Sequence, residues 1–287
     1  MDKLFIESDV IVSFFIGDLR TFLESYQGYM RWIKQKKYPN HKFLIVSDVR
    51  FFCFIEDYIS YNIDLPDFAK ASNLTPLSYE AVENGEILTS PELYSKIIEF
   101  LSQFYNKEKA VEMWSPRGNS DILKGQEQVF NNVEIEGMVL TKPTVTVMCD
   151  PVIKHYVWKE LIDNLSVDFQ VVVYGLIYKP NSNIILVTDM EDLVKYSKSS
   201  LISINTANMY AYIPAVIRSN SYVIGLGDDN LVKIHQKLKI PIGYRTVGTY
   251  KDIYGEDIAD DARKSIIKFR ETDRLRGITD EKLNHII

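Results

Sequence analysis

The sequence predicts an α/β protein built from two Rossmann-like domains. Strand-like and helix-like stretches alternate along nearly the whole chain, the strands are continuous apolar runs, and a second such series begins after Lys142-Pro143. Continuous apolar strands are buried on both faces, as in parallel sheets covered by helices. We therefore expect one domain at residues 1–142 and another at residues 143–287, facing a central cleft that would hold the ligand.

The elements of the first domain follow from local patterns. Residues 19–36 carry apolar side chains at helical spacing, and KFLIVSD at 42–48 is an apolar run that ends in Asp48. Ser90-Pro91 offers an N-cap residue followed by a proline, the usual start of a helix. Prolines, an asparagine and a glycine at 61–89 indicate loops or short elements. The strands expected here are 11–16, 42–48 and 110–115, and the helices are 19–36, one from Pro91 onward, and 120–131.

The second domain repeats the same alternation. Its strands are rich in valine and isoleucine, and Asp189 stands where it would cap the start of a helix. The expected strands are 144–150, 169–175, 183–188, 200–205, 221–227 and 243–247, and the expected helices are 151–165, 189–197, 206–219, 228–238 and 257–276.

Composition places the chain among soluble globular proteins. It is 46% hydrophobic and 25% charged, and no apolar run approaches the roughly 20 residues that span a membrane. Its start lacks the basic-then-apolar order of a signal peptide, so we expect a cytoplasmic protein with reduced Cys53 and Cys149. The four histidines have no metal-ligand spacing, and the net charge of -6 argues against a protein that simply coats nucleic acid.

Several common motifs of nucleotide-binding proteins and of hydrolases are absent from the sequence. No GxGxxG follows a strand, no GxxxxGK[ST] occurs, and no GxSxG nucleophile motif occurs. Two nucleotide-type domains without these motifs fit glycosyltransferases of the GT-B fold. In that class the second domain holds a nucleotide-sugar donor and the first holds the acceptor. The protein must then stabilise a diphosphate leaving group and supply a base for the acceptor hydroxyl.

Asp48 is the candidate for that base, because it ends a buried strand at the edge where ligands bind. Partial removal from water makes a carboxylate a better proton acceptor, and Arg50 is near enough to steer it or to hold a phosphate. The alternative is that Asp48 caps the next turn and pairs with Arg50 on the surface.

The stretch from Val10 to Arg50 resembles the DNA β-glucosyltransferases of T-even phages. It has in order an apolar strand, a glycine turn, a helix containing YMRWIKQKKY, a second apolar strand and the triplet Asp48-Val49-Arg50. The resemblance implies that Asp48 is the catalytic base. It also implies that VTVMCD, ending in Asp150, begins the donor domain, and that Gly175 ends its second strand at the donor site. Where the family has arginines that bind the donor phosphates, this chain has only Lys154 and His155. Where the family has a glutamate that holds the sugar, this chain has a position near Ala215.

Other donor-site candidates lie at element ends. Lys154 and His155 start a helix, where backbone N–H groups attract phosphate, although an ordinary solvated helix face would explain them too. Asn205 ends a strand, where it would either cap the following helix or contact the ribose or a phosphate. Arg218 precedes a strand and would hold a diphosphate, or is a surface charge. Asp228 follows a strand and would bind a divalent ion beside the diphosphate, or caps a helix.

A basic cluster precedes the Asp48 strand and is a candidate DNA contact. Its members are Arg31, Lys34, Lys36, Lys37, His41 and Lys42, and Arg50 and Phe51 are candidates nearby. A base within duplex DNA must be flipped out to reach a cleft, and Phe51, Phe52 and Phe54 would then act as wedge or stacking residues. The alternatives are a solvated helix end for the basic residues and core packing for the phenylalanines.

These observations favour a monomeric glycosyltransferase that moves a sugar from a UDP-sugar to a hydroxyl of a modified base, of the hydroxymethylcytosine type, in double-stranded phage DNA. Mg²⁺ or Mn²⁺ would assist, although no dedicated metal ligands are expected. Such an enzyme would work in the cytoplasm of an infected bacterium and protect phage DNA from restriction. Two alternatives stay open: a GT-B enzyme with an acceptor other than DNA, and a non-catalytic DNA- or nucleotide-binding relative.

Overall fold

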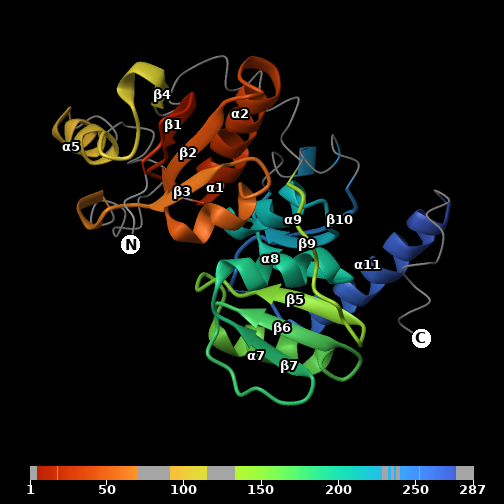
Figure 1. Cartoon of the computed structure of the whole chain (residues 1–287). Helices are drawn as coiled ribbons and strands as arrows, with labels where there is room; N and C mark the ends of the chain where they lie inside the picture. Colours follow the sequence, from red (N-terminus) through yellow and green to blue (C-terminus); the bar gives the residue numbers. More distant parts are fainter. Residues whose placement is uncertain are drawn as a thin grey trace. The chain divides into compact units, whose positions relative to one another are not determined.

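A computed structural model describes residues 5–17, 19–69, 91–114, 133–227, 232–233, 236, 240–251 and 253–275 (Figure 1). The chain divides into two compact units, Met1–Val133 and Glu134–Ile287. The second unit starts before Lys142-Pro143 because residues ahead of that pair form hydrogen bonds with residues later in this unit. The amide of Met138 donates to the carbonyl of Lys195 at 3.3 Å, and Ser199 Oγ donates to the carbonyl of Met138 at 2.8 Å. The helix predicted at 120–131 and most of the one predicted at 228–238 lie outside the described residues.

The first unit contains a parallel sheet in the order β3-β2-β1-β4. Three of these strands were predicted, and β3 was not, because its polar and apolar residues mix as they do on a sheet edge. β1 and β2 are buried along almost their whole length, which confirms the reading of continuous apolar runs as parallel strands. The strands are β1 (Val10–Phe14), β2 (Lys42–Ser47), β3 (Tyr61–Asp64) and β4 (Ala110–Trp114).

Residues 19–37 form one helical segment, as predicted, but it alternates between α-helical and π-helical turns. Its inner stripe packs on β1, where the hydroxyl of Tyr26 donates to Ser13 Oγ at 2.9 Å and both groups are buried. The parts are α1 (Leu19–Thr21), η1 (Phe22–Tyr26), α2 (Gln27–Trp32) and η2 (Ile33–Lys37). Further helices that the structure describes in this unit include η3 (Val49–Phe54), α5 (Pro91–Leu101) and η4 (Lys107–Lys109).

The second unit contains a parallel sheet in the order β10-β9-β8-β5-β6-β7. All six strands were predicted. This is the strand order of a doubly wound nucleotide-binding fold, with the first strand of the unit in the middle. The strands are β5 (Thr144–Met148), β6 (Gln170–Tyr174), β7 (Ile184–Val187), β8 (Ile202–Thr206), β9 (Ser221–Gly225) and β10 (Ile242–Thr246).

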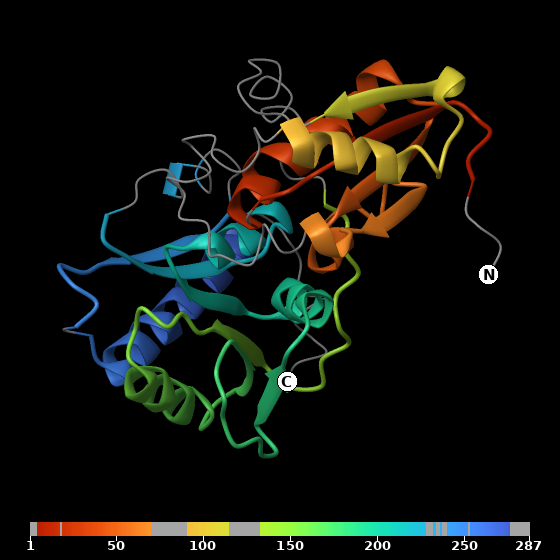
Figure 2. The same ribbon diagram turned by 90° about the vertical axis from the view of Figure 1, so that its left-hand side faces the viewer.

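Helices cover both faces of this sheet. Figure 2 shows α7 and α11 on one face and α8 on the other, and α8 contacts α9. The core between the sheet and the α7–α11 pair is apolar and includes the fully buried Trp158 and Leu161. The helices are α7 (His155–Leu165), α8 (Met190–Ser199), η5 (Met209–Ala211), α9 (Tyr212–Val216) and α11 (Gly255–Leu275).

Candidate functional site

The second sheet reverses its winding direction between β5 and β8. From β5 the chain proceeds outward through β6 and β7, then returns to place β8 on the other side of β5. The loops that follow β5 and β8 therefore diverge to opposite faces and leave a crevice at the carboxyl ends of the strands. In doubly wound folds that crevice is the ligand-binding position. We call this edge, with residues 150–156 and 206–208, the switch-point edge.

Asp150 connects the two diverging loops of the switch-point edge. Its carboxylate accepts a hydrogen bond from the amide of Val152 at 2.8 Å and one from Thr206 Oγ1 at 2.8 Å. The same carboxylate accepts a bond from the side-chain amide of Asn208, and the carbonyl of Asp150 accepts one from Trp158 Nε1 at 2.9 Å. Three donors from two loops thus fix one partly buried carboxylate, so the loop after β5 and the loop after β8 are held together.

The bonds of Asp150 also decide where α7 begins. The sequence predicted a helix from residue 151, but the Asp150 side chain captures the amide of Val152 and α7 starts only at His155. Lys154 occupies the N-cap position without a side-chain cap, and Lys154 and His155 are both exposed. The first turn of α7 therefore presents uncapped backbone amides and two basic side chains at the switch-point edge, where an anion would be favoured.

Gly175, directly after β6, is required by both its conformation and its surroundings. Its φ is +80°, and a Cβ there would lie 2.6 Å from the carbonyl oxygen of Cys149 at the end of β5. The close approach keeps the loops after β5 and β6 in contact at the carboxyl edge of the sheet. Gly227, after β9, has a φ of +105° but no described atom within 4 Å of such a Cβ.

These two glycines form a matched pair for mutation. Replacement of Gly227 by alanine is expected to cost about 1–2 kcal/mol of unfolding free energy, from the positive φ alone. Replacement of Gly175 by alanine should cost clearly more, because the backbone carbonyl of Cys149 must also move. Urea unfolding of the two variants measures the difference. Equal losses would show that the contact with Cys149 does not constrain this edge.

The structure separates the predicted donor-site residues into three groups. Asp150, Lys154, His155 and Gly175 lie at the carboxyl edge, as a donor site requires. Asn205 is fully buried within β8, with its amide 3.5 Å from Ser221 Oγ, so it faces the interior of the unit rather than a ligand. The neighbouring Thr206 and Asn208 provide the polar groups at the edge instead. Asp228 lies outside the described part of the chain.

Arg218 lies at the opposite edge of the sheet, which corrects its assignment to the donor diphosphate. It precedes the amino end of β9 and is exposed, with a φ of 53°. A five-residue strand such as β9 spans about 16 Å, so the guanidinium cannot reach the carboxyl edge where the phosphates would bind. It follows α9, and the alternative of a surface charge at the end of a helix fits its position.

In the first unit, Asp48 follows the carboxyl end of β2 and caps η3. Its carboxylate accepts bonds from the amide and the Nε of Arg50, each at 2.9 Å, and the Asp48 side chain is 16% exposed. The arrangement contains the cap and the arginine pair that the sequence left open as an alternative. The carboxylate lies at the strand end with its orientation fixed by Arg50, and its role as a base stays a prediction.

The basic cluster lies at the other end of the same sheet. Lys34, Lys36 and Lys37 lie in the last turns before the loop to β2, and Lys42 is the first residue of β2. Asp48 follows the last residue of that strand, about 20 Å away at the usual rise per residue. The lysines and Asp48 therefore lie at opposite ends of β2 and do not form one local surface. Lys34 is further engaged, since its Nζ donates to the carbonyl of His41 at 2.7 Å.

Arg31 and Phe51 are structural residues, and their assignment to DNA binding is wrong. The Arg31 side chain is 3% exposed, forms an ion pair with Asp57 and donates to the carbonyl of Phe54 at 2.8 Å. Phe51 is buried in an aromatic cluster, with its ring centroid 4.8 Å from that of Phe22. A buried guanidinium and a buried ring cannot contact a duplex. Arg50, by contrast, is 64% exposed.

Two further findings concern metal ions and membranes. Among the residues that the structure describes, no group of three or more His, Cys, Asp or Glu side chains is placed to hold a metal ion. Within the same residues, no helix is both long and apolar enough to cross a membrane.

Comparison with known proteins identifies the fold. No protein-family model and no curated protein matches the sequence. Among solved structures, ADP-heptose LPS heptosyltransferase II of E. coli aligns with a TM-score of 0.56 and 11% identity, over 91% of this chain and 99% of its own. The E. coli heptosyltransferase WaaC with ADP aligns with a TM-score of 0.55 and 9% identity, over 89% of this chain and 99% of its own. A family 9 glycosyl transferase of Veillonella parvula aligns with a TM-score of 0.51 and 10% identity, over 93% and 100%.

These likenesses confirm the predicted fold class, a pair of Rossmann-like α/β domains of the GT-B type. At identities near 10% they show the fold and nothing finer. The similar structures named above are heptosyltransferases and a family 9 glycosyltransferase, so they do not support the predicted resemblance to the DNA glucosyltransferases of T-even phages.

Proposed function

We propose that this chain is a glycosyltransferase whose second unit binds a nucleotide-sugar at the switch-point edge. One observation carries the proposal: Asp150, Thr206 and Asn208 join the two loops that diverge where the sheet reverses direction. The similar structures named above are glycosyltransferases, and one of them contains ADP. The nucleobase of the donor is not set by these contacts, so ADP- and UDP-sugars are both candidates.

The roles of the residues follow from the chemistry of sugar transfer. The acceptor oxygen attacks the anomeric carbon, the bond from that carbon to the diphosphate breaks, and the nucleoside diphosphate leaves. The uncapped amides at the start of α7, with Lys154 and His155, would stabilise the negative charge of the leaving group. Asp48 would take the proton of the acceptor hydroxyl, with Arg50 holding the carboxylate in place.

The acceptor is less constrained than the donor. Arg31 and Phe51 are buried, so two of the residues expected to contact DNA are not available for it. One of the similar structures is an LPS heptosyltransferase, which favours a saccharide hydroxyl as the acceptor. Hydroxymethylated DNA therefore belongs in the acceptor panel as the competing case, alongside small sugar acceptors.

The test measures release of nucleoside diphosphate from a panel of ADP-, UDP- and GDP-sugars, with each acceptor present and absent. We expect one donor class to be turned over and DNA to give no more product than buffer. A chain that binds nucleotides but turns over no donor would instead be the non-catalytic relative. A chain that binds no nucleotide at all would contradict the proposal.

Asp48→Asn separates the proposed base from the structural cap. Asparagine caps helices as well as aspartate does, so the unfolding free energy should change by less than about 1 kcal/mol. Turnover should fall about 100-fold or more, because the general base is lost. Asp67→Asn, which changes an exposed acid in the same unit, is the control and should be neutral. If the Asp48 variant kept full activity, Asp48 would serve only as the N-cap of η3 and not as the base.

A further inference from the structure

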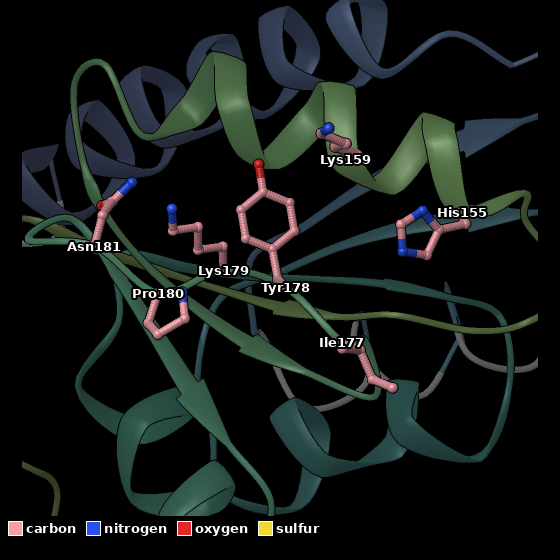
Figure 3. Close-up of a pocket in the computed structure, with 7 residues that line it drawn as sticks. All are labelled: His155, Lys159, Ile177, Tyr178, Lys179, Pro180 and Asn181. Carbon is pink, nitrogen blue, oxygen red and sulfur yellow. The ribbon is translucent and has the colours of Figure 1, made fainter.

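A pocket opens on the α7 face of the second unit, beside the switch-point edge. Its volume is about 490 Å³, and α7 lines one side of it while the crossover between β6 and β7 lines the other (Figure 3). The lining residues are His155 and Lys159 from α7 and Ile177, Tyr178, Lys179, Pro180 and Asn181 from the crossover.

The pocket exists because this crossover contains no helix. β6 ends at Tyr174 and the parallel β7 begins at Ile184, so residues 175–183 alone return the chain across the sheet. Parallel strands are usually joined by a dozen or more residues that include a helix. Here no such helix packs beside α7, and the chain is instead fixed by a turn in which the amide of Asn183 donates to Asn181 Oδ1 at 2.8 Å.

The pocket carries an excess of positive charge. His155, Lys159 and Lys179 converge on it from two elements, and in the described part of the chain none of the three forms an ion pair. Figure 3 shows Lys179 pointing from the crossover toward α7. Two lysine cations that share one cavity, with a histidine beside them as a further hydrogen-bonding group, favour an anionic ligand.

Two acids of α7 lie near the pocket, and each is hydrogen-bonded to a neutral group rather than ion-paired with His155, Lys159 or Lys179 in the described part of the chain. Asp163, farther along α7, accepts a hydrogen bond from the hydroxyl of Tyr178, and Glu160 accepts one from the amide of Gly255 at 2.8 Å. Partial burial and the bond to Asp163 raise the pKa of Tyr178 to about 12, so the ring keeps its proton and acts as a donor. Each carboxylate is therefore engaged with a donor of its own.

We propose that this pocket binds a phosphate-bearing group through Lys159, Lys179 and His155. The inference deepens the proposed function, since the diphosphate of the nucleotide-sugar is one source of such a group. A phosphorylated acceptor is the other source. Ile177, which is 93% exposed at the rim, and Pro180 provide apolar surface for the rest of either molecule.

The test compares the full chain with the double variant Lys159→Ala/Lys179→Ala by calorimetric titration. Inorganic phosphate, ADP, UDP and glucose 1-phosphate are the probes, and uridine is the uncharged reference. Lys251→Ala/Lys268→Ala is the matched control, since it removes two exposed lysines from the same unit and leaves the same net charge. Circular dichroism checks that all three proteins are folded alike.

We expect the natural chain to bind the phosphate-bearing probes, the pocket variant to bind them at least ten-fold more weakly, and the control to stay within two-fold. If ADP or UDP competes with glucose 1-phosphate, the pocket serves the donor; if both bind together, it serves an acceptor. Equal affinity in the pocket variant, or no binding of any probe by the natural chain, would overturn the inference. Phosphate binding that depends on the two lysines, without release of nucleotide from any donor, would leave the pocket standing and remove the proposed function.

Discussion

Asp150→Ala is expected to lower the unfolding free energy by about 3 kcal/mol, because three donors lose one charged acceptor and each such bond contributes about 1.5–3 kcal/mol. Water replaces part of the lost bonding, since the carboxylate is only partly buried, so the sum of the three bonds is not reached. The larger consequence concerns the ligand. Without the bridge to Thr206 and Asn208, the loops after β5 and β8 are free to separate, and nucleotide affinity should fall at least ten-fold.

Asp189→Ala is the control for this prediction. Asp189 also caps a helix in the second unit, but the bond that its carboxylate accepts there, from the amide of Asp192 at 2.8 Å, lies within that one helix turn and joins no second loop. Its loss should cost about 1 kcal/mol and leave nucleotide affinity unchanged. Chemical denaturation and calorimetric titration of both variants provide the comparison. If the two variants lost stability and affinity equally, Asp150 would be an ordinary cap.

Arg31→Ala should destabilise the first unit by about 3 kcal/mol. The substitution leaves the carboxylate of Asp57 and the carbonyl of Phe54 without the guanidinium that pairs with them. Breaking a buried ion pair by removing one partner typically costs 3–5 kcal/mol, and the low end applies because the Asp57 side chain is 26% exposed. The loss should appear in urea unfolding followed by circular dichroism.

The contrast with Lys36 makes this result informative. Lys36 is exposed in the same helical segment, so Lys36→Ala should change stability by less than about 0.5 kcal/mol. A DNA-contact role for Arg31 predicts the reverse pattern, with unchanged stability and weaker, less salt-dependent binding to duplex DNA. A stable Arg31→Ala protein would therefore contradict the structural assignment.

The sequence predicts the fold well because burial on both faces leaves a clear signal. The segments of β1, β2, β5 and β6 are rich in apolar residues and mostly buried, and each forms a parallel strand. β3 was missed since Tyr61, Asn62, Ile63 and Asp64 give an edge strand without such a run.

The site was predicted only in part, because its contacts are made between loops far apart in the chain. Asp150 and Thr206 are 56 residues apart, and no local pattern indicates that the two side chains meet. Asn208 had no signal beyond its place after a strand. Local rules also favoured a longer helix after Asn205, whereas Asn208 Oδ1 accepts from the amide of Tyr210 at 2.9 Å and holds a turn there.

Charge was the least reliable guide to function. The basic residues near Trp32 are close together in the sequence and were predicted to contact DNA. In the fold Arg31 is buried, and the lysines lie at the end of β2 opposite Asp48. Lys159 and Lys179 belong to no sequence motif, but they line the same pocket because a short crossover passes beside α7. The topology of the fold, and not the spacing of residues along the sequence, decides which side chains lie close together.

Hydrogen–deuterium exchange with and without nucleoside diphosphate tests the central claim most directly. Addition of ADP or UDP should slow amide exchange in residues 150–157 and 205–210 of the second unit, because those two loops form the switch-point edge. Nucleotide that slowed exchange only elsewhere, or that left every peptide of the second unit unchanged at saturating concentration, would contradict the account.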